Sequence, residues 1–228
     1  MKLKTFWLSL LFALVVAPIS ADERAKTAQG FALAVKVSIF NDAQISDGKV
    51  ATAETVAARL FAHRGIRIDW LNCGHETETG EERASCSKAA FPEHFEVRLR
   101  QRSRNLNEST LGLSFLGDDG IGCHADVFYA EVEPIQQETG LSAETILGLV
   151  IAHELGHLLL GTNSHETRGI MRANWKKQDL SLASKGMLGF TEHQAQQMRV
   201  RLESGSTTGR AARQEPLSFK KARLPAAN

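Results

Sequence analysis

The spacing of hydrophobic and polar residues along the chain predicts five β-strands. Apolar and polar residues alternate over 31–40, 66–70 and 95–100, with many β-branched and aromatic side chains, as on strands with one buried face. Two shorter stretches, 111–116 and 123–129, lie on either side of a turn rich in glycine and aspartate. We therefore expect these five strands to form the sheet of the fold.

Three segments have the apolar spacing of helices. The first, Val50–His63, ends before Gly65, and the last, Thr191–Leu202, opens with a capping-box pattern. Between them, Ile146–Leu160 is apolar nearly throughout and follows Ser142, a residue type that caps helix N-termini. The order strand, helix, strand at the start of the domain favours parallel pairing, with the helix packed across the sheet.

The middle helix contains the sequence His153-Glu154-Leu155-Gly156-His157. Residues four apart lie on the same helical face, so the two imidazoles can bind one metal ion. Glu154 lies one residue round from His153, where its carboxylate can take a proton from a water bound to that metal. The pattern predicts a zinc site with a general base. The alternative is a buried helix that merely carries two histidines.

The residues after this helix sharpen the prediction. Gly161 lets the chain reverse, because glycine enters the left-handed conformation cheaply. His165 follows the turn, and Met171 comes shortly afterwards. Together with the preceding motif, these residues resemble the metzincin zinc peptidases, in particular the matrixins, whose signature is HExxHxxGxxH followed by a Met-turn. This chain departs from the signature by having three residues, not two, on each side of the glycine.

The resemblance implies roles for individual residues. His153, His157 and His165 would be the zinc ligands, Glu154 the general base, and Met171 the Met-turn residue. It also implies an α+β fold: a mixed, twisted five-stranded sheet with two helices, and a small C-terminal subdomain with one helix. In such a fold the strand at 111–116 would be antiparallel and border the cleft, and Trp175 would lie in the cleft wall.

The N-terminus has the pattern of a targeting segment. Two lysines precede the apolar run Phe6–Val16, and small residues follow it. This predicts a signal peptide over residues 1–21, cleaved after Ala21, and a mature chain that is secreted or periplasmic. A retained anchor is the alternative. The sequence predicts no stable membrane span after cleavage.

The remaining composition is that of one globular domain, predicted over residues 22–202. The net charge is +1, which argues against nucleic acid as a partner. The residues from 203 to 228 are rich in Ser, Thr, Gly and Ala, with scattered Arg and Lys. We therefore expect a disordered basic tail there.

The chain contains three cysteines, at positions 73, 86 and 123. Cys73 and Cys86 flank a polar, charged loop and are predicted to form a disulfide, which an exported protein can keep. Cys123 would be left over, either free and buried or paired between chains. Sequence alone leaves the other pairings open.

These observations favour an exported zinc-dependent endopeptidase that acts on a peptide or protein substrate. One alternative is a gluzincin-like peptidase, whose third zinc ligand would be a downstream carboxylate; Glu192 is the residue available for it. Another is a secreted zinc-fold binding protein with little or no turnover. Glu154 argues against the binding protein, because a structural zinc site needs no base.

Overall fold

The computed structural model describes residues 33–74, 79–102 and 110–214, all within the unit Phe31–Asn228. The signal peptide predicted over residues 1–21 lies outside the described residues. So does the end of the predicted tail, residues 215–228.

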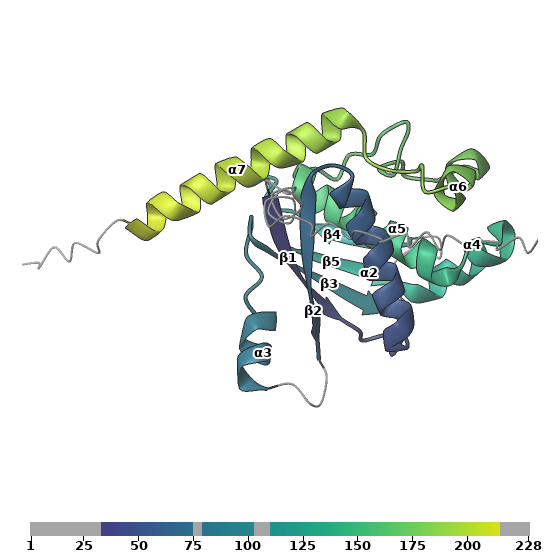
Figure 1. Cartoon of the computed structure of the whole chain (residues 1–228), viewed down its shortest axis with the longest axis horizontal. Coiled ribbons are helices and arrows are strands. Elements are labelled where there is room, and N and C mark those ends of the chain that lie inside the picture. The colour runs from purple at the N-terminus through teal and green to yellow at the C-terminus, as the bar shows by residue number, and fades with distance from the viewer. Residues whose placement is uncertain (1–32, 75–78, 103–109, 215–228) are drawn as a thin grey trace, which may run out of the picture. The chain divides into compact units, whose positions relative to one another are not determined.

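The domain is built on one mixed five-stranded sheet with the strand order β2-β1-β3-β5-β4 (Figure 1). Strands β1, β2, β3 and β5 are parallel, and β4 is antiparallel to β5 at the edge of the sheet. The predicted α+β architecture with a five-stranded mixed sheet is therefore confirmed. So are the parallel pairing of the first two strands and the antiparallel edge strand. The strands are β1 Leu33–Phe40, β2 Ile66–Cys73, β3 His94–Arg100, β4 Gly112–Phe115 and β5 His124–Phe128.

Two long helices make the main core with this sheet. Helix α2, Asp47–Ala62, packs on β2 and on α5, and α5, Ala143–Leu160, also packs on β4 and β5. The alternating residues Val35, Val37 and Ile39 of β1 are almost fully buried, as expected for one face of a strand. The core thus fixes α5, the helix that carries the His-Glu-x-x-His sequence, beside the antiparallel edge strand.

The structure contains several short helices that the sequence pattern did not predict. They are α3 Gly80–Cys86, the 3₁₀ helix η1 Tyr129–Glu131, α4 Val132–Thr139 and α6 Lys177–Ser184. Helix α6 lies after Met171, so the C-terminal part of the domain has two helices where one was expected. Helix α4 lies between β5 and α5 in the chain and packs on α5.

The last helix is longer than predicted. Helix α7 spans Glu192–Gln214, whereas the sequence predicted an end near Leu202 and disordered residues after it. Its contacts with a distant segment explain the difference: the guanidinium of Arg201 lies 5.3 Å from the ring centre of Phe91, and the α7 backbone approaches the same ring at Gly205. Tertiary packing of this kind stabilises a helix whose own sequence is a poor helix former.

The predicted disulfide between Cys73 and Cys86 is present, with a Cα–Cα distance of 5.9 Å. It joins the end of β2 to the end of α3. The carbonyl of Cys86 also accepts a hydrogen bond from the buried hydroxyl of Ser38. Cys123 forms no disulfide with any described residue, and its side chain is partly buried.

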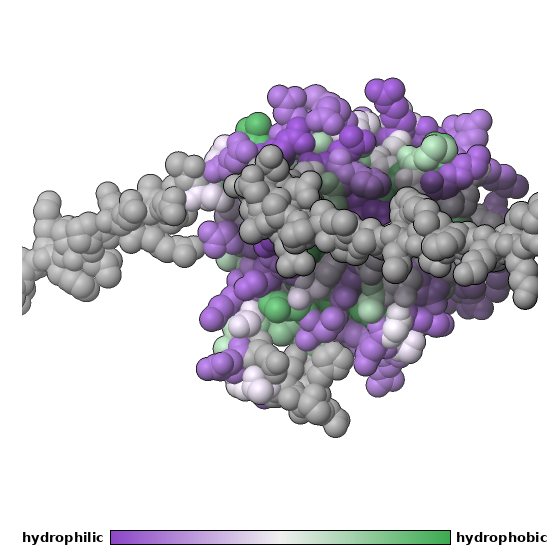
Figure 2. All heavy atoms as spheres, viewed as in Figure 1, coloured by the Kyte–Doolittle hydropathy of each residue, from purple (hydrophilic) through white to green (hydrophobic). Residues whose placement is uncertain are grey.

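Helix α5 is apolar because it is the central core helix. By length and composition, α5 is the one described helix that could cross a membrane. The sequence analysis did not predict this, but 83% of the helix is buried inside the protein. A helix that is hydrophobic all round belongs in a core or a membrane, and its burial accounts for the composition here. Where coloured residues are visible in Figure 2, the surface is mainly hydrophilic, with small hydrophobic spots.

Candidate metal centre

Helix α5 holds its two histidines rigidly because both of its ends are capped. The Ser142 hydroxyl accepts a hydrogen bond from the Thr145 amide at 3.2 Å, and Gly161 ends the helix in the left-handed conformation at φ 68°. Both caps agree with the sequence prediction. His153 and His157 lie four residues apart on one buried face.

The two imidazoles of this pair point their Nε2 atoms at each other, 3.1 Å apart. Each Nδ1 lies 2.7 Å from a backbone carbonyl, that of Ile170 for His153 and that of Thr162 for His157. Because a carbonyl only accepts, each Nδ1 carries the proton and donates it. Each neutral ring therefore has a lone pair on Nε2, and the two lone pairs face the same point.

Burial also favours the neutral form of both rings. It lowers the pKa of His153 to about 4, against the hydrogen bond to Ile170, and the neighbouring His157 and His165 lower it further. Burial lowers the pKa of His157 in the same way. Two neutral acceptors at 3.1 Å cannot hydrogen-bond to each other, but both can bind one cation.

His165 completes a group of three. It comes from the segment after Gly161 and is exposed, and its ring centre lies 5.3 Å from that of His153 and 4.9 Å from that of His157. One nitrogen from each ring lies within 4.8 Å of the others, so the three side chains could hold one metal ion. Neutral imidazoles suit zinc, and three of them leave its fourth position open.

Glu154 lies beside this group but is not part of it. The Ser114 hydroxyl lies 2.6 Å from the Glu154 Oε2 and 2.9 Å from its backbone carbonyl, and so can donate to either. The Glu154 residue is 5% exposed. Burial raises the pKa of Glu154 to about 7, and the hydrogen bond from Ser114 opposes the rise. The side chain is thus held in one position next to the histidines.

Strand β4 shapes the space around Glu154 through two residues that the sequence reasoning missed. Ser114 provides the hydroxyl, and Gly112 leaves room for the carboxylate: a methyl group on Gly112 would lie 2.5 Å from the Glu154 Oε1. Because side chains alternate along a strand, Gly112 and Ser114 share the face toward α5, while Leu113 and Phe115 point outward and are exposed. The alternation was the available signal, but the partner of the strand was unknown.

Met171 packs against Gly156 of α5, and the Trp175 indole lies beside the His153 ring. Met171 is fully buried, and a methyl group on Gly156 of α5 would lie 2.5 Å from its Sδ. The Trp175 indole donates to the Ile170 carbonyl at 3.0 Å, the same oxygen that accepts from His153. One carbonyl therefore orients both a histidine ring and the indole.

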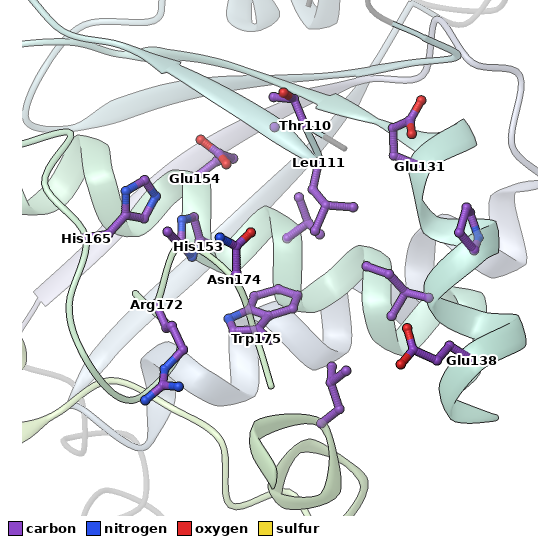
Figure 3. A pocket seen from close by; sticks show the side chains of 16 residues that line it. Thr110, Leu111, Glu131, Glu138, His153, Glu154, His165, Arg172, Asn174 and Trp175 are labelled. Carbon is purple, nitrogen blue, oxygen red and sulfur yellow. The ribbon is translucent and has the colours of Figure 1, made fainter. Parts of the chain in front are cut away.

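A cavity of about 490 Å³ opens beside His153, Glu154 and His165 (Figure 3). The size is typical of sites that take a small ligand or a substrate side chain. Trp175 lies in its wall, where it was predicted. The other lining residues come from β4 and the two residues before it, from η1, α4 and α5, and from the segment after Met171 with α6. They are Thr110, Leu111, Gly112, Glu131, Pro134, Ile135, Glu138, Val150, Arg172, Ala173, Asn174 and Leu180.

Glu192, the alternative third ligand, has other partners. Its carboxylate lies 3.2 Å from Arg64 and 3.0 Å from Arg199, and it does not belong to the histidine group. The structure therefore brings His165, and not Glu192, to the candidate site.

This chain is similar to known proteins at the level of solved structures. No protein-family model and no curated protein matches this chain. Among solved structures, the crystal structure of a zinc-dependent peptidase from Methanocorpusculum labreanum (strain Z) is similar, with a TM-score of 0.47 and 14% sequence identity. The match covers 71% of this chain and 99% of that one. At this level, the likeness does not identify what this chain does.

Proposed function

We propose that this chain is an exported zinc-dependent endopeptidase of the metzincin type. His153, His157 and His165 would hold the zinc, and Glu154 would be the general base. The observation that carries the proposal is the convergence of two neutral Nε2 atoms, each fixed by a Nδ1–carbonyl hydrogen bond, next to a buried carboxyl at the mouth of a cavity. Outer hydrogen bonds of this kind are typical of histidines that ligate metals.

The protein side chains have separate tasks in this proposal. Zinc, when bound, supplies Lewis acidity, which polarises the scissile carbonyl and makes water more acidic. Glu154 takes a proton from the attacking water and passes it to the leaving amine, and Ser114 holds its carboxylate in place. Gly112 keeps the space around that carboxylate free of side-chain atoms.

An extended peptide has a place to bind beside these residues. Strand β4 is an edge strand, so one side of its backbone pairs with no described strand of the sheet. A peptide can pair with such an edge as an added strand, which would carry it past Glu154. Export is part of the proposal and is supported by the N-terminal sequence pattern and by the Cys73–Cys86 disulfide.

The test separates metal binding from turnover. Purified protein should contain about one zinc per chain by elemental analysis and should cleave members of a general peptide library. Glu154→Gln should keep the zinc and the fold but lose at least about 100-fold in turnover. Glu133→Gln, an exposed carboxyl on α4, is the matched control and should cleave like the wild type.

Absence of zinc from protein refolded with the metal would refute the proposal. Zinc without cleavage of any library peptide, by the wild type or the variant, would indicate a binding protein instead.

A further inference from the structure

The α4 side of the cavity carries two carboxyl groups that take no part in the histidine group. Glu131 is the N-cap residue of α4 and has helical backbone angles, and it is followed by Ile135 and Glu138 at spacings of four and three. These spacings place the three side chains on one helical face, and all three line the cavity. That face therefore presents an apolar side chain flanked by two carboxylates.

Much of the remaining lining of the cavity is apolar. Val150 of α5, Leu111, Leu180 and Trp175 line it together with Ile135. Figure 3 shows Glu131 and Glu138 at the end of the pocket away from His153, Glu154 and His165. A side chain entering from the catalytic end would pass along apolar surface before it reaches the carboxylates.

The nearby cations leave both carboxylates able to accept a ligand. The Arg102 guanidinium lies 3.7 Å from Glu131, which is longer than a hydrogen bond, and its side chain is 64% exposed. Lys177 lies 3.9 Å from Glu138, and its side chain is 88% exposed. The Lys177–Glu138 pair is exposed on both sides and is therefore weak, whereas Glu131 is mostly buried and only its partner Arg102 is exposed.

The third cation near the cavity, Arg172, is engaged elsewhere. Its guanidinium donates to the Thr167 carbonyl and lies 3.4 Å from the carboxylate of Asp179. Arg172 is also at the histidine end of the pocket in Figure 3, away from Glu131 and Glu138. Among the lining residues, the α4 side of the cavity therefore presents two carboxylates and no cation.

We propose that this cavity selects a basic side chain, lysine or arginine, at a position of the substrate next to the scissile bond. The proposal rests on the proposed function for its reaction and names the substrate class of the same site. The aliphatic stem packs on Leu111, Ile135 and Trp175, and the cationic head binds Glu138, while Glu131, two helical turns away on the same face, adds its negative charge to the pocket. A norleucine side chain would fill the apolar part alone and leave the Glu138 carboxylate without a ligand.

Cleavage of matched peptides measures this preference. The substrates are N-acetylated quenched peptides that differ at one position, which carries lysine, norleucine or glutamate, and mass spectrometry maps the cleaved bond. We expect kcat/KM for lysine to exceed that for norleucine about tenfold in low salt, and the ratio to fall as salt screens the charges. Glu138→Gln should bring the ratio near one, and Glu138→Lys should favour the glutamate peptide.

Two further variants control for structural effects. Glu133→Gln lies on the exposed side of the same helix and should leave the lysine-to-norleucine ratio unchanged. Glu131→Gln should lower the ratio less than Glu138→Gln does, because Glu131 acts on the cationic head at longer range. The Glu131 side chain is only 11% exposed, so a thermal melt accompanies that variant. If Glu131→Gln does not fold, Glu138→Gln and Glu138→Lys test the proposal, because the Glu138 side chain is more exposed.

A binding measurement makes the result independent of turnover. Fluorescence anisotropy with Glu154→Gln and labelled lysine or norleucine peptides should give about tenfold tighter binding of lysine, lost when Glu138→Gln is added. If no peptide is cleaved but this difference is found, the proposed function fails and the basic-side-chain site stands. Equal affinity for both peptides, no binding of either, or a lysine preference that appears only with a free amino terminus overturns the site.

Discussion

Glu54 is a buried residue of α2 and is not part of the histidine group. Ionisation of its carboxyl group should lower the free energy of unfolding. It is 6% exposed, and among the described residues its Oε1 has no hydrogen-bond partner. It lines an open hollow between α2 and β2, next to Ile68 and Trp70. Burial raises the pKa of Glu54 to about 7, and a hydrogen bond with Asn72 opposes the rise.

The sign of the effect follows from the direction of the shift. The pKa of Glu54 is about 7 in the fold and 4.5 as the ordinary value, so the folded chain holds the proton through this interval while the unfolded chain releases it. The stabilisation from the proton is complete below pH 4.5 and is lost as the pH rises to about 7. A shift of this size corresponds to at most about 3.4 kcal/mol, and water in the open hollow reduces it to about 2 kcal/mol.

Glu54→Gln tests this magnitude because glutamine has the shape of the protonated acid and does not titrate. Chemical denaturation of the wild type and the variant from pH 4 to pH 8.5 gives the difference in unfolding free energy. We expect this difference to be near zero at the acid end and about 2 kcal/mol in favour of the variant at pH 8. Glu133→Gln controls for the loss of a surface charge. A difference that does not change with pH, or a variant less stable at pH 8, would refute the reasoning.

Three further predictions concern the candidate site. His165→Ala should weaken zinc affinity by several orders of magnitude in a chelator competition, and Glu192→Gln should leave it nearly unchanged; the reverse result would favour the gluzincin-like reading. Met171→Ala removes a fully buried side chain and should lower the unfolding free energy by about 2–4 kcal/mol in urea denaturation, so a loss under about 1 kcal/mol would contradict its packing role. Gly112→Ala should displace the Glu154 carboxylate and reduce peptide turnover about tenfold or more, with the zinc content unchanged. Turnover equal to that of the wild type would show that the backbone of β4 moves and the carboxylate does not.

The elements that form the sheet and the central helix were predictable because their signals are local. The run at 111–116 alternates, and β4 is found at Gly112–Phe115. Helix α5 ends at Gly161, where glycine takes the left-handed conformation. In each case the residues that define the element lie within it or directly beside it, so a short window of sequence contains the information.

The features that were missed depend on partners far along the chain. Helix α7 continues past Leu202 because Arg201 and Gly205 meet Phe91, a contact that no local pattern contains. Ser114 looks like an ordinary polar residue in an alternating strand until β4 is placed against α5. The segment that forms α4 is polar on most of its surface, and its apolar face becomes evident only with the cavity it lines.

The lengthened segment between Gly161 and His165 shows why ligand spacing alone is a poor guide to the metal centre. The first residue after the glycine, Thr162, gives its carbonyl to the Nδ1 of His157 and so fixes that ring. The same short segment then brings His165 within reach of both rings. Its length is therefore set by two requirements, a carbonyl at one end and an imidazole at the other. One added residue on each side of the glycine is compatible with both, because a ligand set is defined by where its nitrogens meet.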